Sequence, residues 1–226
     1  MLERVNSAGR ELRPASLLEA LRERTKQLHA RAERTGIVAE ILHRRVNVAG
    51  YALLLRNLLP VYRTMEQALA GHRTSVVVGL IVRPELERAA AIEADLQAIA
   101  SIYRIGELTQ LPEAKRYANA IRQASEGTGI RLIAHAYARY LGDLSGGQIL
   151  KRLLERSLDL PPEALSFYDF SGISDIAAFK AEYRSAIERA GDELGDFDSI
   201  AEEGARAFEL NIGLSVALQE SAMRAG

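Results

Sequence analysis

The sequence has four histidines, whose ring nitrogens could bind a metal ion. One of them, His29, has an acidic residue, Glu33, four positions later. Residues four apart share one face of an α-helix, so this imidazole and carboxylate can interact. A carboxylate beside one ring nitrogen fixes the tautomer and leaves the other nitrogen free to bind a metal ion. The pair therefore fits a metal ligand with its supporting acid, although a solvated pair on a helix surface is the simpler interpretation.

A second candidate site is a run of glycines around an acid: Gly142, Asp143, Gly146 and Gly147. Apolar residues at helical spacing precede and follow the run, which indicates a helix passing through it. Three glycines inside a helix cost roughly 2–3 kcal/mol in total relative to alanine. Either the helix ends in a turn here, or the missing side chains let the backbone lie against a flat ligand. The run is not a phosphate loop, because it lacks the ending GK[ST].

Helical periodicity in almost the whole chain provides the elements that would position these residues. Ser16 with Glu19 and Ser199 with Glu202 form capping-box patterns before the first and last helices. Strand-like alternation is absent except at residues 75–82, whose state the pattern leaves open. The expected helices cover about residues 17–32, 47–69 (with Pro60 as a kink), 84–103, 112 onward, 129–158, 176–190 (capped by Ser174) and 199 onward. The sequence therefore predicts an all-α fold built from packed helix faces.

The composition is that of an ordinary globular protein, with 226 residues, 48% of them hydrophobic and 26% charged, and a net charge of -1. This charge gives no general attraction to nucleic acid or anionic membranes. The chain has no cysteine, which excludes disulfides and thiolate chemistry and fits a cytoplasmic location. The longest apolar run, residues 76–82, is too short to span a membrane. We expect a flexible N-terminal leader at residues 1–13 and one domain at residues 14–226.

Four segments together resemble the haem oxygenase family. The longest, AHAYARYLGDLSGGQ at residues 134–148, is similar to the family signature. TKQLHARAE at residues 25–33 resembles its proximal-helix motif, and FKAEYRS (179–185) and AFELN (207–211) resemble later helices. The similarity runs in order over about residues 17–218. It implies a single-domain, all-α fold that holds haem between a proximal helix and a kinked, glycine-containing distal helix.

The resemblance also implies a role for each residue of the two candidate sites. His29 is the proximal iron ligand and Glu33 its partner. Gly142 and Gly146 line the distal face, where the lack of side chains leaves room for O2. Asp143 organises a distal water that can give a proton to iron-bound O2.

Two further residues, Arg139 and Tyr62, match members of the same distal hydrogen-bond network. Leu59 and Pro60, beside the tyrosine, depart from the family pattern. Cations for the haem propionates are implied at Arg22, Lys180 and Arg184, with the hydroxyl of Tyr137 as a further contact. Two residues match a helix beside the pocket, Phe208 and Asn211.

In such an enzyme haem b is both cofactor and substrate. O2 and electrons from an external donor open its ring at a meso carbon, giving biliverdin, CO and ferrous iron. The implied redox partner is a ferredoxin, a flavodoxin or a flavoprotein reductase, and neither nucleic acid nor a membrane anchor is expected.

Other interpretations use some of the same residues. A haem carrier or sensor that does not degrade haem would use the same histidine and glycines. A ferritin-like di-iron protein needs two Glu-x-x-His pairs, and the chain has only one, at Glu40 and His43. A thiaminase-like enzyme would need a cysteine nucleophile, and a nucleic-acid-binding module would need a basic surface.

Overall fold

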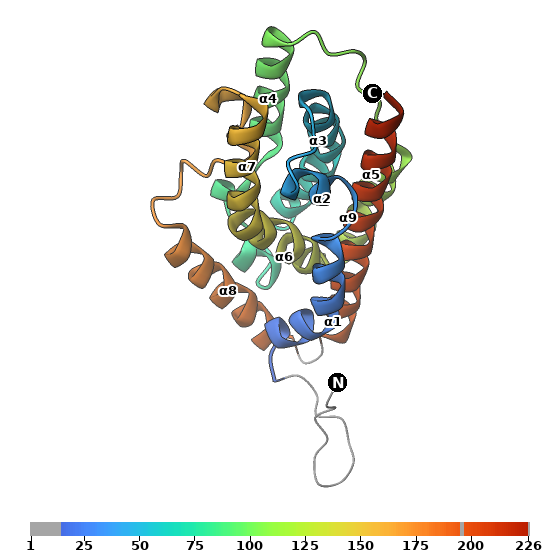
Figure 1. Cartoon of the computed structure of the whole chain (residues 1–226). Coiled ribbons are helices and arrows are strands. Elements are labelled where there is room, and N and C mark those ends of the chain that lie inside the picture. The colour runs from blue at the N-terminus through green and yellow to red at the C-terminus, as the bar shows by residue number, and fades with distance from the viewer. Residues whose placement is uncertain (1–14, 195–196, 226) are drawn as a thin grey trace.

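The computed structural model describes residues 15–194 and 197–225, in which helices joined by loops are the regular secondary structure and no β-strand occurs (Figure 1). The predicted all-α fold is therefore confirmed, whereas the expected leader at residues 1–13 lies outside the described residues. In chain order the elements are α1 (Leu17–Ala32), α2 (Gly36–Leu42), α3 (Val48–Gly71), η1 (Val78–Ile81), η2 (Pro84–Leu86), α4 (Ala89–Ile102), α5 (Pro112–Ala124), α6 (Leu132–Gly142), η3 (Asp143–Gly147), α7 (Gln148–Leu158), η4 (Pro162–Ala164), η5 (Ser166–Tyr168), α8 (Ile176–Asp192) and α9 (Asp198–Ala225).

Local chemistry explains where several of these helices begin. The hydroxyl of Ser16 accepts a hydrogen bond from the Glu19 amide at the start of α1, at 3.2 Å. Asn47 caps α3 in the same way, accepting from the Gly50 amide at 2.8 Å. Pro60 lies inside α3, yet the helix continues to Gly71. The predicted caps of α1 and α3 are therefore confirmed.

Other predicted boundaries are wrong by a few residues. Pro84 opens a 3-10 turn, and the helix after it begins only at Ala89. Asp175 caps α8 through its side chain, a role that the sequence had suggested for Ser174. The last helix begins at Asp198, which places Ser199 inside its first turn and rules out the predicted cap. Polar residues are dense at each of these places, so several neighbours satisfy the same capping pattern.

Two short elements also differ from the sequence prediction. The ambiguous β-branched run at residues 75–82 forms the 3-10 turn η1. The short helix α2, which begins at Gly36, was not among the expected helices. Isolated helices of this length are unstable without tertiary packing, so local periodicity gives little sign of them.

The long helix α9 organises the fold. It runs along one side of the molecule (Figure 1) and contacts α1, α2, α3, α5 and α6. Gly204 lets α1 approach closely, because a Cβ atom there would lie 2.7 Å from Cδ2 of Leu21. Since α1 and α6 both pack on α9, this helix fixes how the two elements with the candidate site residues lie relative to each other.

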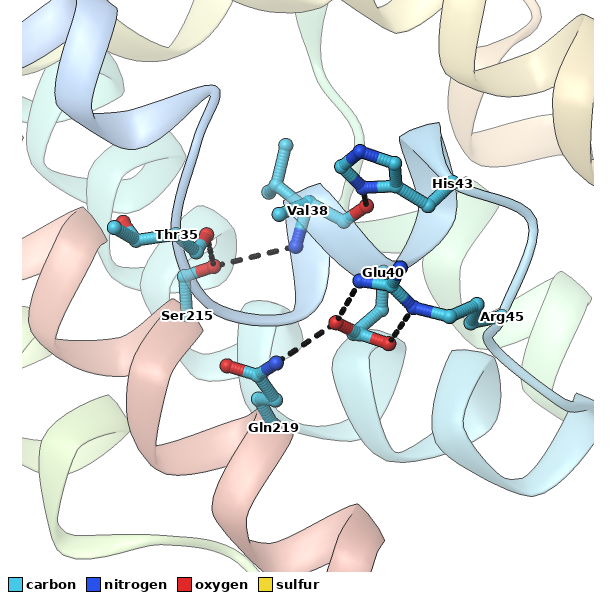
Figure 2. Close-up of polar contacts among 8 residues, drawn as sticks. Thr35, Val38, Glu40, His43, Arg45, Ser215 and Gln219 are labelled. Atoms are coloured by element: carbon cyan, nitrogen blue, oxygen red, sulfur yellow. Dashed lines mark hydrogen bonds and ion pairs between the residues drawn. The ribbon is translucent and has the colours of Figure 1, made fainter.

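Polar contacts hold α2 on α9 (Figure 2). Ser215 of α9 accepts a hydrogen bond from the Val38 amide at 3.4 Å and donates one to the Thr35 carbonyl at 3.3 Å. Gly36, between them, has a φ of 68°, and a Cβ atom would lie 2.3 Å from the Ser215 backbone. Only glycine fits this position, both for its conformation and for its space.

Glu40 and His43, the one Glu-x-x-His pair, are both engaged in these local contacts. Glu40 accepts hydrogen bonds from Nε and Nη2 of Arg45, each at 2.8 Å, and from Nε2 of Gln219 at 2.8 Å. The Nδ1 atom of His43 lies 2.7 Å from the Ala39 carbonyl (Figure 2). Within the described residues no group of three His, Cys, Asp or Glu side chains could hold a metal ion, which argues against the di-iron interpretation.

None of the described helices combines the length and the apolar character needed to cross a membrane.

Candidate functional site

His29 lies on the exposed face of α1 with its imidazole accessible. Its side chain is 58% exposed, and Nδ1 lies 3.6 Å from Oε1 of Glu33. The ring packs at a tilt against Phe208 of α9, with 5.8 Å between the ring centroids. Phe208 is itself buried, so α9 gives the imidazole a firm support on one side.

The other three histidines have hydrogen-bond partners that occupy a ring nitrogen. His43 is bonded to its own helix, as described above, and Nε2 of His72 lies 2.9 Å from the Ser125 carbonyl. His135 is fully buried, with Nε2 3.0 Å from Oε1 of Glu203. Among the polar contacts of the described residues, the ring of His29 has only the 3.6 Å approach to Glu33, which leaves it available to bind a metal.

A buried polar network joins three helices near the glycine run. Tyr62 of α3 donates a hydrogen bond from its hydroxyl to Oδ2 of Asp143. Arg139 of α6 donates to the Tyr62 hydroxyl from Nε at 2.9 Å and from Nη2 at 2.6 Å. Its Nη1 donates to Oδ1 of Asn211 on α9 at 2.6 Å. The network orients the Asp143 carboxylate at the point where α6 ends.

Burial and neighbouring charges shift the pKa values of two residues in this network. Burial raises the pKa of Asp143, although the positive charge of Arg139 and the hydrogen bond from Tyr62 act in the opposite direction. Burial also raises the pKa of the Tyr62 hydroxyl; the positive charge of Arg139 acts against this rise, and the negative charge of Asp143 adds to it. Tyr62 thus keeps its proton and donates it in a hydrogen bond, while the pKa of Asp143 lies above that of an ordinary aspartate.

At residues 143–147 the α-helical hydrogen bonding gives way to a π-helical turn, η3, between α6 and α7. Such turns frequently occur at functional sites. The α-carbons of Gly142 and Gly146 are accessible, and a Cβ atom at either position would meet no other atom within 4 Å. This surface can therefore accept a flat group against the backbone, as the sequence suggested.

Comparisons with known proteins agree on one family. The family model described as "Heme oxygenase" matches residues 15–217. The chain belongs to the haem oxygenase family. It is 34% identical to heme oxygenase 1 of Synechocystis sp. over 93% of this chain and 88% of that protein. It is 35% identical to human heme oxygenase 1, over 92% of this chain and 73% of that protein.

Solved haem oxygenase structures share the fold. The enzyme from Leptospira interrogans has a TM-score of 0.82 and 36% identity, covering 89% of this chain and 99% of that one. Heme oxygenase-1 from the cyanobacterium Synechocystis sp. in complex with heme has a TM-score of 0.83 and 33% identity, and the match covers 93% of this chain and 96% of that one.

In this haem oxygenase, the cations assigned to the propionates lie on α1 and α8. Lys180 extends towards the π-turn, with Nζ 3.4 Å from the hydroxyl of Ser145. Arg184 and Arg22 are exposed, and Tyr137 is half-buried. The roles of these four residues at the propionates are predictions from the family resemblance.

The structure adds contacts that the sequence did not predict for two residues of this site. Asn211 was placed near the pocket, and the structure adds its hydrogen bond to Arg139. Gly147 differs from the other two glycines, because a Cβ atom there would lie 2.9 Å from Cδ1 of Tyr168. The motif alone gives no sign of this difference, since all three glycines occur in one short run.

Gly142→Ala is expected to separate stability from haem binding. Gly142 has a helical conformation, with φ of -63° and ψ of -48°, so alanine should raise the free energy of unfolding by about 0.5–1 kcal/mol. The added methyl group enters the open surface and should lower haem affinity and turnover. Denaturant unfolding and haem titration measure the two effects. Gly71→Ala, at the exposed end of α3, is the matched control and should change only stability.

The raised pKa of Asp143 predicts the pH dependence of stability. An ordinary aspartate in the unfolded chain has a pKa of about 3.9, so the folded state binds this proton more readily. The contribution of Asp143 to stability is therefore largest below about pH 3.9 and declines as the pH rises through the raised pKa. Asparagine does not titrate, so the Asp143→Asn variant lacks this decline. In urea unfolding of the haem-free protein, the free energy of unfolding of the variant should therefore rise relative to that of the wild type as the pH increases from about 3.9 through the raised pKa. Parallel stability curves for the two proteins would show that Asp143 titrates normally.

Proposed function

We propose that this chain binds haem through His29 and cleaves it at a meso carbon to biliverdin, CO and ferrous iron, using O2 and electrons from an external donor. The observation that carries the proposal is the buried network of Tyr62, Arg139 and Asp143 on a π-turn beside open glycine surface. A haem carrier needs the ligand and the open surface, but it has no need of an acid with a raised pKa.

The residues on the proximal side fit a haem group. The imidazole of His29 is exposed and free, and Glu33 is close enough to pair with Nδ1 when a small side-chain movement shortens the 3.6 Å separation. That contact would leave Nε2 for the iron. Phe208 packs against the ring and limits its rotation.

On the distal side, the protein would supply an open surface for the haem and a group that positions a proton-donating water. Haem, when bound, supplies the iron that activates O2 and the ring that is oxidised. Gly142 and Gly146 keep side chains away from the reacting face. Arg139 orients Tyr62, and Tyr62 orients Asp143. The Asp143 carboxylate would accept a hydrogen bond from a water at the open glycine surface and so hold that water where it can supply a proton.

The cations at the edge of the site would orient the haem in its plane. Lys180 and Arg184 are four residues apart on α8, and Arg22 lies on α1 near the surface side chains of Glu19 and Lys26. Paired with the haem propionates, they would select which meso carbon faces the distal network. Tyr137 would add a hydroxyl contact.

The electron donor is proposed to be a ferredoxin, a flavodoxin or a flavoprotein reductase. The absence of cysteine fits a reducing compartment, and the cytoplasm is the proposed location.

An absorbance time course tests the proposal. Purified protein is mixed with ferric haem and then given a reductant in air, with catalase present to remove free peroxide. We expect a Soret band that forms and then decays into the biliverdin spectrum. A Soret band that persists through reduction with several donors would instead indicate a haem carrier or sensor, and no Soret shift would exclude haem binding.

A further inference from the structure

The distal π-turn rests on a short segment, Ser166–Phe170, which we call the support segment. It includes the 3-10 turn η5, which contacts α4, α7 and the π-turn η3. Phe167 and Tyr168 are buried within it, and their rings lie 4.4 Å apart. The segment thus lies between α4 on one side and the distal residues on the other.

The support segment contacts the distal network at three points. The ring of Phe167 packs edge-on against Tyr62, with 5.4 Å between centroids. The ring of Tyr168 fills the space above Gly147, where a Cβ atom would lie 2.9 Å from Cδ1 and 3.3 Å from Cε1. The Tyr168 carbonyl accepts a hydrogen bond from Nε2 of Gln148 at 2.9 Å. A shift of the support segment would therefore move both Tyr62 and the π-turn that carries Asp143.

One buried carboxylate holds this segment in place. Asp95 of α4 is fully buried, and its two oxygens accept hydrogen bonds from the amides of Ser166 at 2.7 Å and Phe167 at 2.8 Å. Burial raises the pKa of Asp95, and these amide bonds act against the rise. Burying a carboxylate costs free energy of desolvation. The placement of Asp95 at both amides therefore indicates that the position of this segment matters to the protein.

A second clamp lies at the other end of the segment. Arg88, which is 8% exposed, donates to the Asp169 carbonyl at 2.7 Å and lies 4.2 Å from the ring centroid of Phe170. Both clamps come from α4 and the residue before it, so this helix fixes the support segment at its two ends.

We propose that Asp95 is a positioning residue for the distal site: it holds the support segment against Tyr62 and Gly147, and so sets where the Tyr62 hydroxyl and the Asp143 carboxylate meet. The catalytic part of this inference rests on the proposed function, whereas the mechanical part does not. Misplacement of a reacting group by about 1 Å can lower a rate by about 100-fold, so a contact outside the site can control turnover.

The first test is Asp95→Asn, which replaces one acceptor oxygen by an amide donor facing an N–H group. In the haem-free protein, we expect faster hydrogen exchange at the amides of residues 143–147 and 166–168, with α5 unchanged. In the haem complex, we expect turnover to fall by about 10- to 100-fold, with haem affinity changed by much less. Asp175→Asn is the matched control, because the Asp175 carboxylate also accepts from a backbone amide, that of Ala178 at the exposed start of α8, and not from an amide of the support segment.

A second test approaches the same contact from the other side. Gly147→Ala inserts a methyl group against Tyr168 and should reproduce the exchange and turnover changes. The double variant Gly147→Ala, Tyr168→Leu relieves the clash and should recover most of the lost turnover, which a purely global loss of stability would not allow.

The outcomes distinguish the proposals. Unchanged exchange at residues 143–147 in Asp95→Asn, together with no recovery in the double variant, would overturn the positioning role. If Asp95→Asn does not fold, the Gly147 and Tyr168 variants decide. If the wild-type protein does not turn over haem, the proposed function fails, while the exchange data on the haem-free protein still test the mechanical coupling.

Discussion

His29→Ala is expected to reduce haem turnover by more than about 100-fold, because loss of even an outer partner of a metal-bound histidine costs about 10- to 100-fold. The variant should keep its fold, since the side chain is 58% exposed and makes little contribution to the core. Its complex with ferric haem should lose the spectrum of a histidine-ligated iron. Added imidazole can occupy the vacated position and should restore both the spectrum and part of the turnover.

His43→Ala is the control for this variant, because His43 is also exposed and is bonded only to the carbonyl of its own helix. It should bind and degrade haem like the wild type. A His29→Ala protein with an unchanged haem spectrum would show that another residue is the axial ligand. His72 and His135 are poor alternative ligands, because a ring nitrogen of each is already hydrogen-bonded within the protein.

Asp143→Asn is expected to lower the rate of biliverdin formation by about 100- to 10,000-fold, the usual contribution of a positioned acid or base. Asparagine can still accept the hydrogen bond from Tyr62, so the fold and the haem affinity should be preserved. The amide cannot hold or give a proton, so reduced haem and O2 should be consumed with little biliverdin. Single-turnover absorbance with catalase present measures the yield.

Asp159→Asn is the matched control, because Asp159 is exposed at the end of α7 in a left-handed conformation that asparagine tolerates well. It should leave turnover unchanged. Wild-type rates in Asp143→Asn would mean that water alone supplies the proton, and that the buried network serves only to stabilise the fold.

The sequence was sufficient to predict the parts of this structure that depend on local patterns. Apolar residues at helical spacing indicated most of the helices, and the caps at Ser16 and Asn47 were located to the residue. The position of α2 was missed because it depends on contacts from Ser215 and Gln219, which are about 180 residues away in the chain. Local propensity contains no information about such distant partners.

The candidate site shows the same division. Histidine and glycine spacing, together with the family resemblance, placed His29, Gly142 and Asp143 on the elements where the structure has them. The reason that Gly147 must be small became visible only from the packing of Tyr168. The role we propose for Asp95 had no sequence signal either, because a buried aspartate on a helix face resembles any solvated one until its partners are known.

The most direct test of the central claim is a product count in a single turnover. The wild-type protein, loaded with one equivalent of haem, is reduced in air with catalase present, and biliverdin, CO and ferrous iron are each quantified. The account predicts that all three appear in equal amounts and account for the haem consumed. Loss of the haem absorbance without CO and biliverdin in equal amounts would contradict it, because such a protein would bleach haem without performing the ring cleavage that the site is proposed to direct.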